Sequence, residues 1–275
     1  MRIRFENLFR NASTTYYYSS IFFPKNTKQD IFTLYAYVRT ADDFVDKIPA
    51  DKAEFLNFKK ETIEHIEGKK ESDNEIIREF LKLAERKKFD KSWIIDFLKS
   101  MESDLTKKVY HTKEELDTYI YGSAEVIGLM ICRIIGIKEQ YYEGAKKLGY
   151  SMQLINFIRD IEEDNGLGRT YIPKEYYDKY ELKNLTRSEA EKNKDAFSRI
   201  VREQISIYKN LRKESHNYFK GIPYRQRVPI KTASDMYNWT ANKIYKNPMI
   251  VYNKKVKPRK TRVILYIIKN TLFPW

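Results

Sequence analysis

Two pairs of aspartates carry the strongest chemical signal in this sequence. Asp160 and Asp164 stand four residues apart, and Asp42 and Asp46 repeat that spacing far upstream. Residues four apart lie on one face of an α-helix, so each pair would direct its carboxylates to one side. A single such pair is typical of an ordinary solvated helix, and it is the second copy that favours a shared site. Four carboxylates converging from two facing helices would suit Mg²⁺, which prefers oxygen ligands.

Other polar residues share the faces of these two helices. Upstream, Tyr35 and Arg39 continue the row of Asp42 and Asp46 at helical steps. Around the second pair, the polar and aromatic candidates are Gln153, Asn156, Arg159, Arg169 and Tyr171. Guanidinium groups bind phosphate oxygens through parallel hydrogen bonds, so arginines beside paired carboxylates indicate a site for phosphate and metal together.

Each aspartate row needs a helix whose other faces are apolar. The first is predicted over residues 29–48 and ends at Pro49, with apolar neighbours at the same period. The second is predicted over residues 139–164. It is stopped by the Asn165–Gly168 stretch, since Asn and Gly tolerate the left-handed conformation that closes a last turn.

The remainder of the chain also shows helical periodicity. Further helices are predicted over residues 51–67, 72–88, 90–108, 113–136, 186–219 and 225–247. No Pro/Gly/Ser-rich linker divides the 275 residues, so we expect a single all-α domain over residues 1–275. The apolar segment 113–136 contains Gly122, Gly128 and Gly136, which permit close approach of either a neighbouring helix or a substrate.

Four motifs in order now point to a known family. They are Tyr35-Ala-Tyr-Val-Arg39 leading into Asp42-Asp-Phe-Val-Asp46, Met101-Glu-Ser-Asp104-Leu105, Tyr119-Ile-Tyr121-Gly122-Ser-Ala-Glu-Val-Ile-Gly128, and Gln153 to Asp164 followed by Gly168-Arg169-Thr-Tyr171-Ile-Pro173. The chain resembles the squalene/phytoene synthase family of head-to-head prenyl transferases over nearly its whole length. Its second aspartate motif has the form typical of phytoene synthases.

The resemblance implies an all-α, single-domain prenyl (terpenoid) synthase fold with a central cavity. It also implies a set of site residues. The metal ligands would be Asp42, Asp46, Asn156, Asp160 and Asp164, holding Mg²⁺ or alternatively Mn²⁺. The catalytic residues would be those four aspartates with Tyr35, Tyr121, Tyr171 and Tyr237. The substrate-binding residues would be Arg39, Gln153, Asn156, Arg159 and Arg169.

The hydroxyls of Ser13 and Thr15 match a serine-rich element that helps to hold one diphosphate in the family. A basic residue often found there is Thr14 in this chain. The same segment could instead be a helix cap that leads to Pro24.

The implied reaction joins two geranylgeranyl diphosphates through a cyclopropyl intermediate to give phytoene. No Gly-x-Gly-x-x-Gly segment is present, and NADPH is not expected. The nearest alternatives are squalene or dehydrosqualene synthases, which use two farnesyl diphosphates. A metal-dependent diphosphate hydrolase is another alternative. From another class, a non-catalytic basic helical protein could bind membranes or nucleic acid.

The formal charge of +14 calls for an anionic partner. Basic residues are scattered over many helices without a recognised nucleic-acid fold, so no nucleic acid is expected. The densest basic run lies in the tail, residues 253–275, beside an apolar run too short to span a bilayer, which favours an anionic membrane surface. The charged residues at positions 1–10 and the single Cys132 predict a cytoplasmic protein, peripheral on the inner face of the membrane. The sequence does not predict an oligomeric state.

Overall fold

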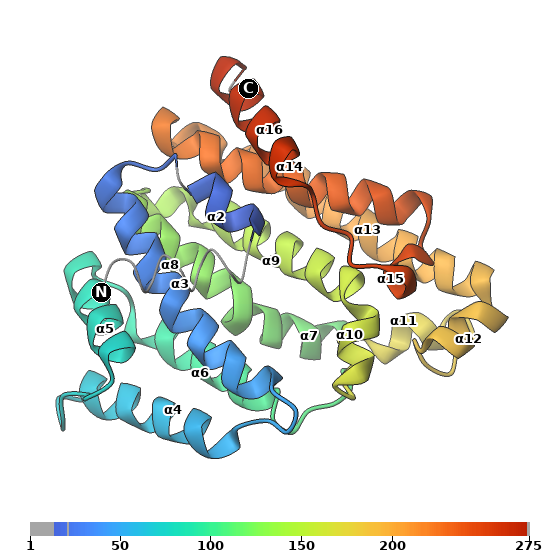
Figure 1. Cartoon of the computed structure of the whole chain (residues 1–275), viewed down its shortest axis with the longest axis horizontal. Helices are drawn as coiled ribbons and strands as arrows, with labels where there is room; N and C mark the ends of the chain where they lie inside the picture. The colour runs from blue at the N-terminus through green and yellow to red at the C-terminus, as the bar shows by residue number, and fades with distance from the viewer. Residues whose placement is uncertain (1–13, 21, 274–275) are drawn as a thin grey trace.

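The computed structural model describes residues 14–20 and 22–273, and the side chains of residues 14–16 are excepted (Figure 1). Throughout these residues the regular structure is helical, apart from an isolated parallel bridge between Val109 and Thr170. The longer α-helices are α3 (Lys25–Asp46), α4 (Lys52–Ile66), α5 (Glu75–Lys87), α6 (Lys91–Ser103), α8 (Val126–Ile135), α9 (Tyr142–Arg159), α13 (Lys194–His216), α14 (Tyr224–Lys246) and α16 (Lys260–Leu272). The shorter elements are α2 (Thr14–Ser20), α7 (Lys113–Ile120), η1 (Tyr121–Glu125), η2 (Glu139–Tyr141), α10 (Ile161–Gly166), α11 (Lys174–Asp178), α12 (Arg187–Lys192), η3 (Phe219–Gly221) and α15 (Ile250–Asn253).

The all-α prediction is confirmed, and two of the predicted helices are interrupted. The predicted helix 139–164 breaks at Asp160, whose ψ of 14° leaves the helical region and separates α9 from α10. The predicted helix 113–136 contains a π-helical turn, η1, between α7 and α8. A π turn inserts one residue into the helix and changes which side chains face each way.

Helix α9 lies at the centre of the molecule. It packs against α8 and η1 on one side and against α13 and α14 on another (Figure 1). Helix α3 packs against α4, α5, α6 and α8, while α16 lies across α14 and α2. The helices that carry the two aspartate pairs are thus interior elements, each held by several neighbours.

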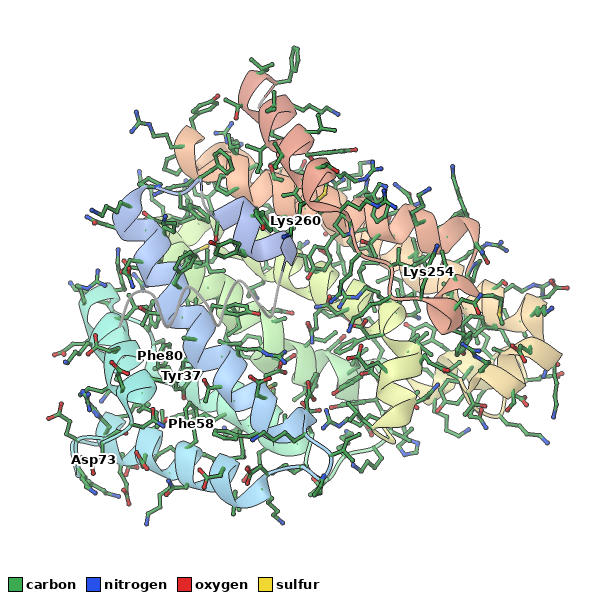
Figure 2. All side chains as sticks on the ribbon, in the orientation of Figure 1. Tyr37, Phe58, Asp73, Phe80, Lys254 and Lys260 are labelled. Atoms are coloured by element: carbon green, nitrogen blue, oxygen red, sulfur yellow. The ribbon has the colours of Figure 1, made fainter. Side chains whose placement is uncertain are left out.

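An aromatic cluster fixes α3 in the core. Tyr37 stacks on Phe80 of α5 with 3.8 Å between ring centroids and lies 5.0 Å from Phe58 of α4 (Figure 2). Its hydroxyl donates a hydrogen bond to Thr62 Oγ1 at 3.2 Å, which satisfies the buried polar atom. Because Tyr37 is buried on one side of α3, the row from Tyr35 to Asp46 is turned to a different side.

The glycines of segment 113–136 contact neighbouring helices. A Cβ added to Gly122 would stand 2.3 Å from the Asp96 carbonyl oxygen of α6, and one added to Gly128 would stand 2.9 Å from the Ala145 carbonyl oxygen of α9. The neighbouring-helix interpretation therefore holds for both. Gly136 has a φ of 73° and ends α8 in the left-handed conformation.

The same segment, Lys113–Ile135, is long and apolar enough to cross a membrane by length and composition. Half of its most apolar stretch is buried inside the protein, and α7, η1 and α8 pack against α6 and α9. Its apolar character is explained by its place in the core.

Candidate active site

The predicted row of polar residues on α3 includes Arg39, Asp42 and Asp46, and Asp46 is bound by Arg169 of the second aspartate motif. Arg39 donates to the Asp42 carboxylate at 2.7 Å and approaches Asp43 at 2.5 Å. Asp42 and Asp46 keep 35% and 38% of their side chains exposed, so both side chains are half-buried.

The second row lies on α9 and α10. The amide nitrogen of Asn156 donates to Gln153 Oε1 at 3.1 Å, and Arg159 Nε donates to Asp160 at 2.9 Å. The Asn156 Oδ1 atom is buried and has no hydrogen-bond partner among the described residues. Such an atom is costly to bury alone, so it marks a place where a donor or a cation would bind.

Arg169 links the second motif to the first. Gly168, with a φ of 68°, turns the chain after α10, and Thr170 N then donates to Lys108 O at 2.8 Å. This turn buries the Arg169 side chain, which is 5% exposed. Its guanidinium donates to Asp46 Oδ1 at 2.8 Å and to the Val45 carbonyl oxygen, so it joins the segment after α10 to the end of α3.

Asp104 is a buried member of this network to which the sequence analysis gave no role. Its carboxylate accepts hydrogen bonds from Tyr119 Oη at 2.7 Å and from Tyr171 Oη at 2.9 Å. Tyr171 Oη in turn accepts from Arg169 at 3.3 Å. Burial raises the pKa of Asp104 to about 6, although the two tyrosines and Arg169 act in the opposite direction. Asp104 was included in the Met101–Leu105 motif in the sequence analysis. A single aspartate has no helical spacing to a second one, so its tyrosine partners could not be predicted.

The two aspartate pairs face one another. Burial, together with the negative charges of Asp160 and Asp46, raises the pKa of Asp164 to about 8. Burial likewise raises the pKa of Asp42 to about 7, with Asp46 as the next contributor. Arg169, which follows α10, binds Asp46 of α3, and the charge of Asp46 acts on Asp164, so the ends of the two aspartate motifs lie close together.

The four tyrosines that were predicted to be catalytic do not all lie in one place. Tyr35 and Tyr237 lie close together, since the charge of Tyr237 acts on Tyr35, whose pKa burial raises strongly. Tyr171 stacks on Phe157 with 4.2 Å between centroids, inside the network around Asp104. Tyr121 is not brought to the aspartate pairs: its charged neighbours are Asp96 of α6, Lys146 of α9 and Glu125 of η1 itself.

Tyr119, and not Tyr121, is the tyrosine of this motif that lies in the network around Asp104. It contacts Asp104 and lies 5.3 Å from Tyr171 between ring centroids. The motif contains two tyrosines two residues apart, and only the turn of the helix decides which of them points inward. Ser13 lies outside the described residues, as does the side chain of Thr15.

Lys255 is a further residue that sequence reasoning missed. Its ammonium lies 3.3 Å from Asp160 and also pairs with Glu163. The residue belongs to the stretch between α15 and α16, which the sequence analysis assigned to a basic tail. Nothing in the spacing of that tail indicated contact with the second aspartate motif.

Among the described residues, no group of three or more His, Cys, Asp or Glu side chains is arranged to hold a metal ion. Basic side chains pair with three of the four aspartates, Asp42, Asp46 and Asp160. The oxygen donors nevertheless fit a divalent cation. Asn156 Oδ1 lacks a partner, and the raised pKa values of Asp42 and Asp164 reflect burial and repulsion that a cation would relieve.

Comparison with known proteins now adds to this geometry. The family model for squalene/phytoene synthase matches residues 9–262. The chain belongs to that family. It is a prenyltransferase of the phytoene/squalene synthase type, and the resemblance inferred from the motifs is confirmed. Family membership also argues against a non-catalytic binding protein.

Relatives of two substrate types are similar at nearly the same level. The 4,4'-diapophytoene synthase of Staphylococcus haemolyticus is 24% identical over 87% of this chain and 85% of its own. The 15-cis-phytoene synthase of Synechocystis is 24% identical over 92% of this chain and 79% of its own. Identity at this level leaves the exact substrate open.

Solved structures confirm the fold. A dehydrosqualene synthase in complex with ligand has a TM-score of 0.86 at 22% identity, covering 99% of this chain and 96% of its own. A squalene synthase from Alicyclobacillus acidocaldarius has a TM-score of 0.76 at 19% identity, covering 90% of this chain and 93% of its own. The chain has the terpenoid-synthase fold of these proteins.

Proposed function

We propose that this protein is a phytoene synthase, which condenses two geranylgeranyl diphosphates head to head and requires no reductant. The observation that supports the reaction class is the convergence of the two aspartate pairs beside Arg39, Arg159 and Arg169. Cations and carboxylates at one place suit a substrate that carries a diphosphate leaving group together with a divalent ion.

The carboxylates of Asp42, Asp46, Asp160 and Asp164, with Asn156 Oδ1, would hold Mg²⁺. When bound, this ion would neutralise charge on the departing diphosphate as a Lewis acid. The guanidiniums of Arg39 and Arg159 lie at the edge of this cluster and would donate hydrogen bonds to the phosphate oxygens once carboxylate contacts are exchanged.

The aromatic side chains beside the carboxylates would then protect the allylic cation. Tyr171, Tyr119 and Phe157 form one packed group, and Tyr35 lies with Tyr237 on α3 and α14. Ring faces stabilise a nearby cation by electrostatic attraction and exclude water from it. Asp104 would position two of these rings by accepting their hydroxyl hydrogen bonds.

A second candidate uses farnesyl diphosphate and gives a C30 product. It is favoured by the likeness to the Staphylococcus 4,4'-diapophytoene synthase and by the TM-score of 0.86 to a dehydrosqualene synthase. Both candidates use the same carboxylates and arginines. They differ in how long a chain the interior accepts.

The experiment supplies the purified protein with Mg²⁺ and either the C15 or the C20 diphosphate, with and without NADPH, and identifies the extracted hydrocarbon by mass. We expect a C40 product from the C20 diphosphate without NADPH. A C30 product would keep the reaction class and transfer the assignment to the farnesyl substrate. No hydrocarbon from either substrate, with folded protein, would overturn the proposal.

A further inference from the structure

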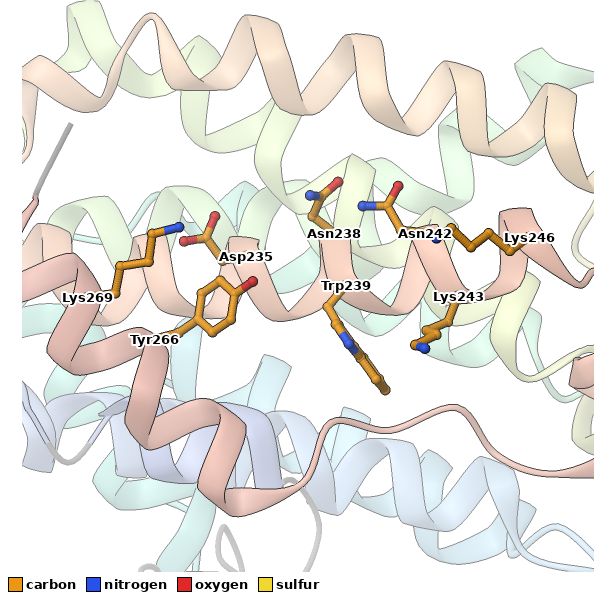
Figure 3. A pocket seen from close by; sticks show the side chains of 8 residues that line it. All are labelled: Asp235, Asn238, Trp239, Asn242, Lys243, Lys246, Tyr266 and Lys269. Atoms are coloured by element: carbon orange, nitrogen blue, oxygen red, sulfur yellow. The ribbon is translucent and has the colours of Figure 1, made fainter.

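A polar pocket lies between α14 and α16, and its lining residues are other than those of the aspartate cluster. It has a volume of about 310 Å³ and is lined by Asp235, Asn238, Trp239, Asn242, Lys243, Lys246, Tyr266 and Lys269 (Figure 3). The α14 residues recur at steps of three and four, so they form one face of that helix. The pocket is large enough for a phosphate group and the glycerol attached to it.

The pocket has an excess of positive charge. Its carboxylate, Asp235, is already neutralised by Arg212 at 2.7 Å and by Lys231 at 2.9 Å. Among the described residues, Lys243, Lys246 and Lys269 form no ion pair with any carboxylate. These three ammonium groups are therefore available to an anion that enters the pocket.

Trp239 extends the basic surface from the pocket to the start of α16. The Arg262 guanidinium lies over its ring, 4.8 Å from the centroid, and the Lys243 ammonium lies 5.9 Å from the same centroid. Tryptophan beside arginine and lysine is typical of the boundary between a bilayer and water.

An exposed apolar row runs along α16 next to this pocket. Leu265, Ile268 and Leu272 are 65%, 53% and 67% exposed, and Phe273 beyond the helix is 66% exposed. They lie opposite Val263 and Ile267, which pack on α14, and about a quarter turn from the pocket-facing side chains. A soluble protein seldom exposes a contiguous apolar row without a partner for it.

We propose that α14 and α16 form a docking surface for an anionic phospholipid bilayer. The apolar row of α16 enters the interfacial region, and Lys243, Lys246 and Lys269 bind a lipid phosphate in the adjacent pocket. The occupant is a bilayer rather than another protein, because cations without an ion pair among the described residues lie beside the apolar row and complement an anionic surface. The inference needs neither substrate nor product, so it stands or fails independently of the proposed reaction.

The test measures co-sedimentation of the full-length protein with phosphatidylcholine vesicles, with and without phosphatidylglycerol. The pocket variant is Lys243→Gln/Lys269→Gln, and its control is Lys52→Gln/Lys192→Gln, which removes the same charge from exposed sites on α4 and α12. The row variant is Leu265→Ser/Ile268→Ser, and its control is Leu56→Ser, a half-exposed leucine on α4. Far-UV circular dichroism and the urea unfolding midpoint of each variant check that it is folded.

We expect wild-type protein to bind anionic vesicles much more tightly than neutral ones. The pocket variant should bind them about 25-fold more weakly, since each cation near an anionic surface is worth about fivefold. The row variant should bind anionic vesicles about tenfold more weakly, or weaker still, because less apolar surface is buried in the bilayer. Unchanged binding by both variants would overturn the proposal, as would an equal loss in the lysine control. If inorganic phosphate stabilised wild type but not the pocket variant, and wild type did not bind vesicles, the lipid assignment would be overturned.

Discussion

At the scale of single residues, the site combines carboxylates whose charges raise one another's pKa with arginines that pair with three of them. Asp164 shows this most clearly, since burial and the charges of Asp160 and Asp46 all raise its pKa. Asn156 also lacks a partner: its buried Oδ1 atom accepts no hydrogen bond from any described residue. Raised carboxylate pKa values and an unsatisfied buried oxygen in one cluster are expected of a functional site.

Replacing Asp160 by Asn should lower the rate of hydrocarbon formation by about 100-fold or more, because a charged ligand and the partner of Arg159 are lost together. Initial rates under saturating Mg²⁺ measure this effect. Asp73→Asn, on an exposed loop, provides the control and should match wild type. A variant at Asp160 with wild-type turnover would remove this aspartate from the catalytic site.

Asp104 predicts a pH dependence of stability. Its pKa is about 6 in the folded protein and near 4 when unfolded, so the folded state binds more protons between these values. The stability that this group contributes is therefore full below pH 4 and is lost as pH rises through 6. The free energy of unfolding of wild type, relative to Asp104→Asn, should fall by about 2–3 kcal/mol between pH 4 and pH 7.

Urea unfolding of both proteins at several pH values measures that difference. A relative stability that rises with pH would show that hydrogen bonds from Tyr119 and Tyr171 outweigh burial. Loss of the two tyrosine contacts should also lower turnover, because Asp104 positions rings beside the reacting centre.

At the scale of elements, helical periodicity predicted where the helices lie but not how they are interrupted. The helices that carry both aspartate pairs were predicted from spacing and apolar flanks alone. The break at Asp160 and the π turn over Tyr121–Glu125 were not predicted. The turn η1 packs against α6 and α9, and α10 packs against α15, and a local sequence pattern does not contain such contacts. Tyr119 lies in the last turn of α7, before the π turn begins, and it is this residue and not Tyr121 that reaches Asp104.

Gly122 tests whether this helix contact matters for stability. An alanine there would place its Cβ 2.3 Å from the Asp96 carbonyl oxygen, so α6 or η1 must shift. We expect Gly122→Ala to lower the free energy of unfolding by about 1–3 kcal/mol. Gly166→Ala, where a Cβ meets open space, should change it little. Equal urea midpoints for the two variants would contradict close packing at η1.

At the scale of the whole molecule, the chain uses one side of its central helices for packing and another for charge. Sequence motifs predicted the family, the all-α fold and most of the converging residues. They did not predict Lys255 beside Asp160, nor that α16 and α14 share a basic pocket, because those contacts join segments far apart in the chain. The cytoplasmic location, the central cavity and the metal remain predictions.

The most direct test of the account counts products in one reaction. The protein is given Mg²⁺ and the C20 diphosphate, and released diphosphate is measured together with hydrocarbon and prenyl alcohol. Head-to-head condensation predicts two diphosphates for each C40 hydrocarbon and no prenyl alcohol, with both signals abolished by EDTA. Diphosphate released with equal prenyl alcohol and no carbon–carbon bond would show a hydrolase and contradict the proposed condensation.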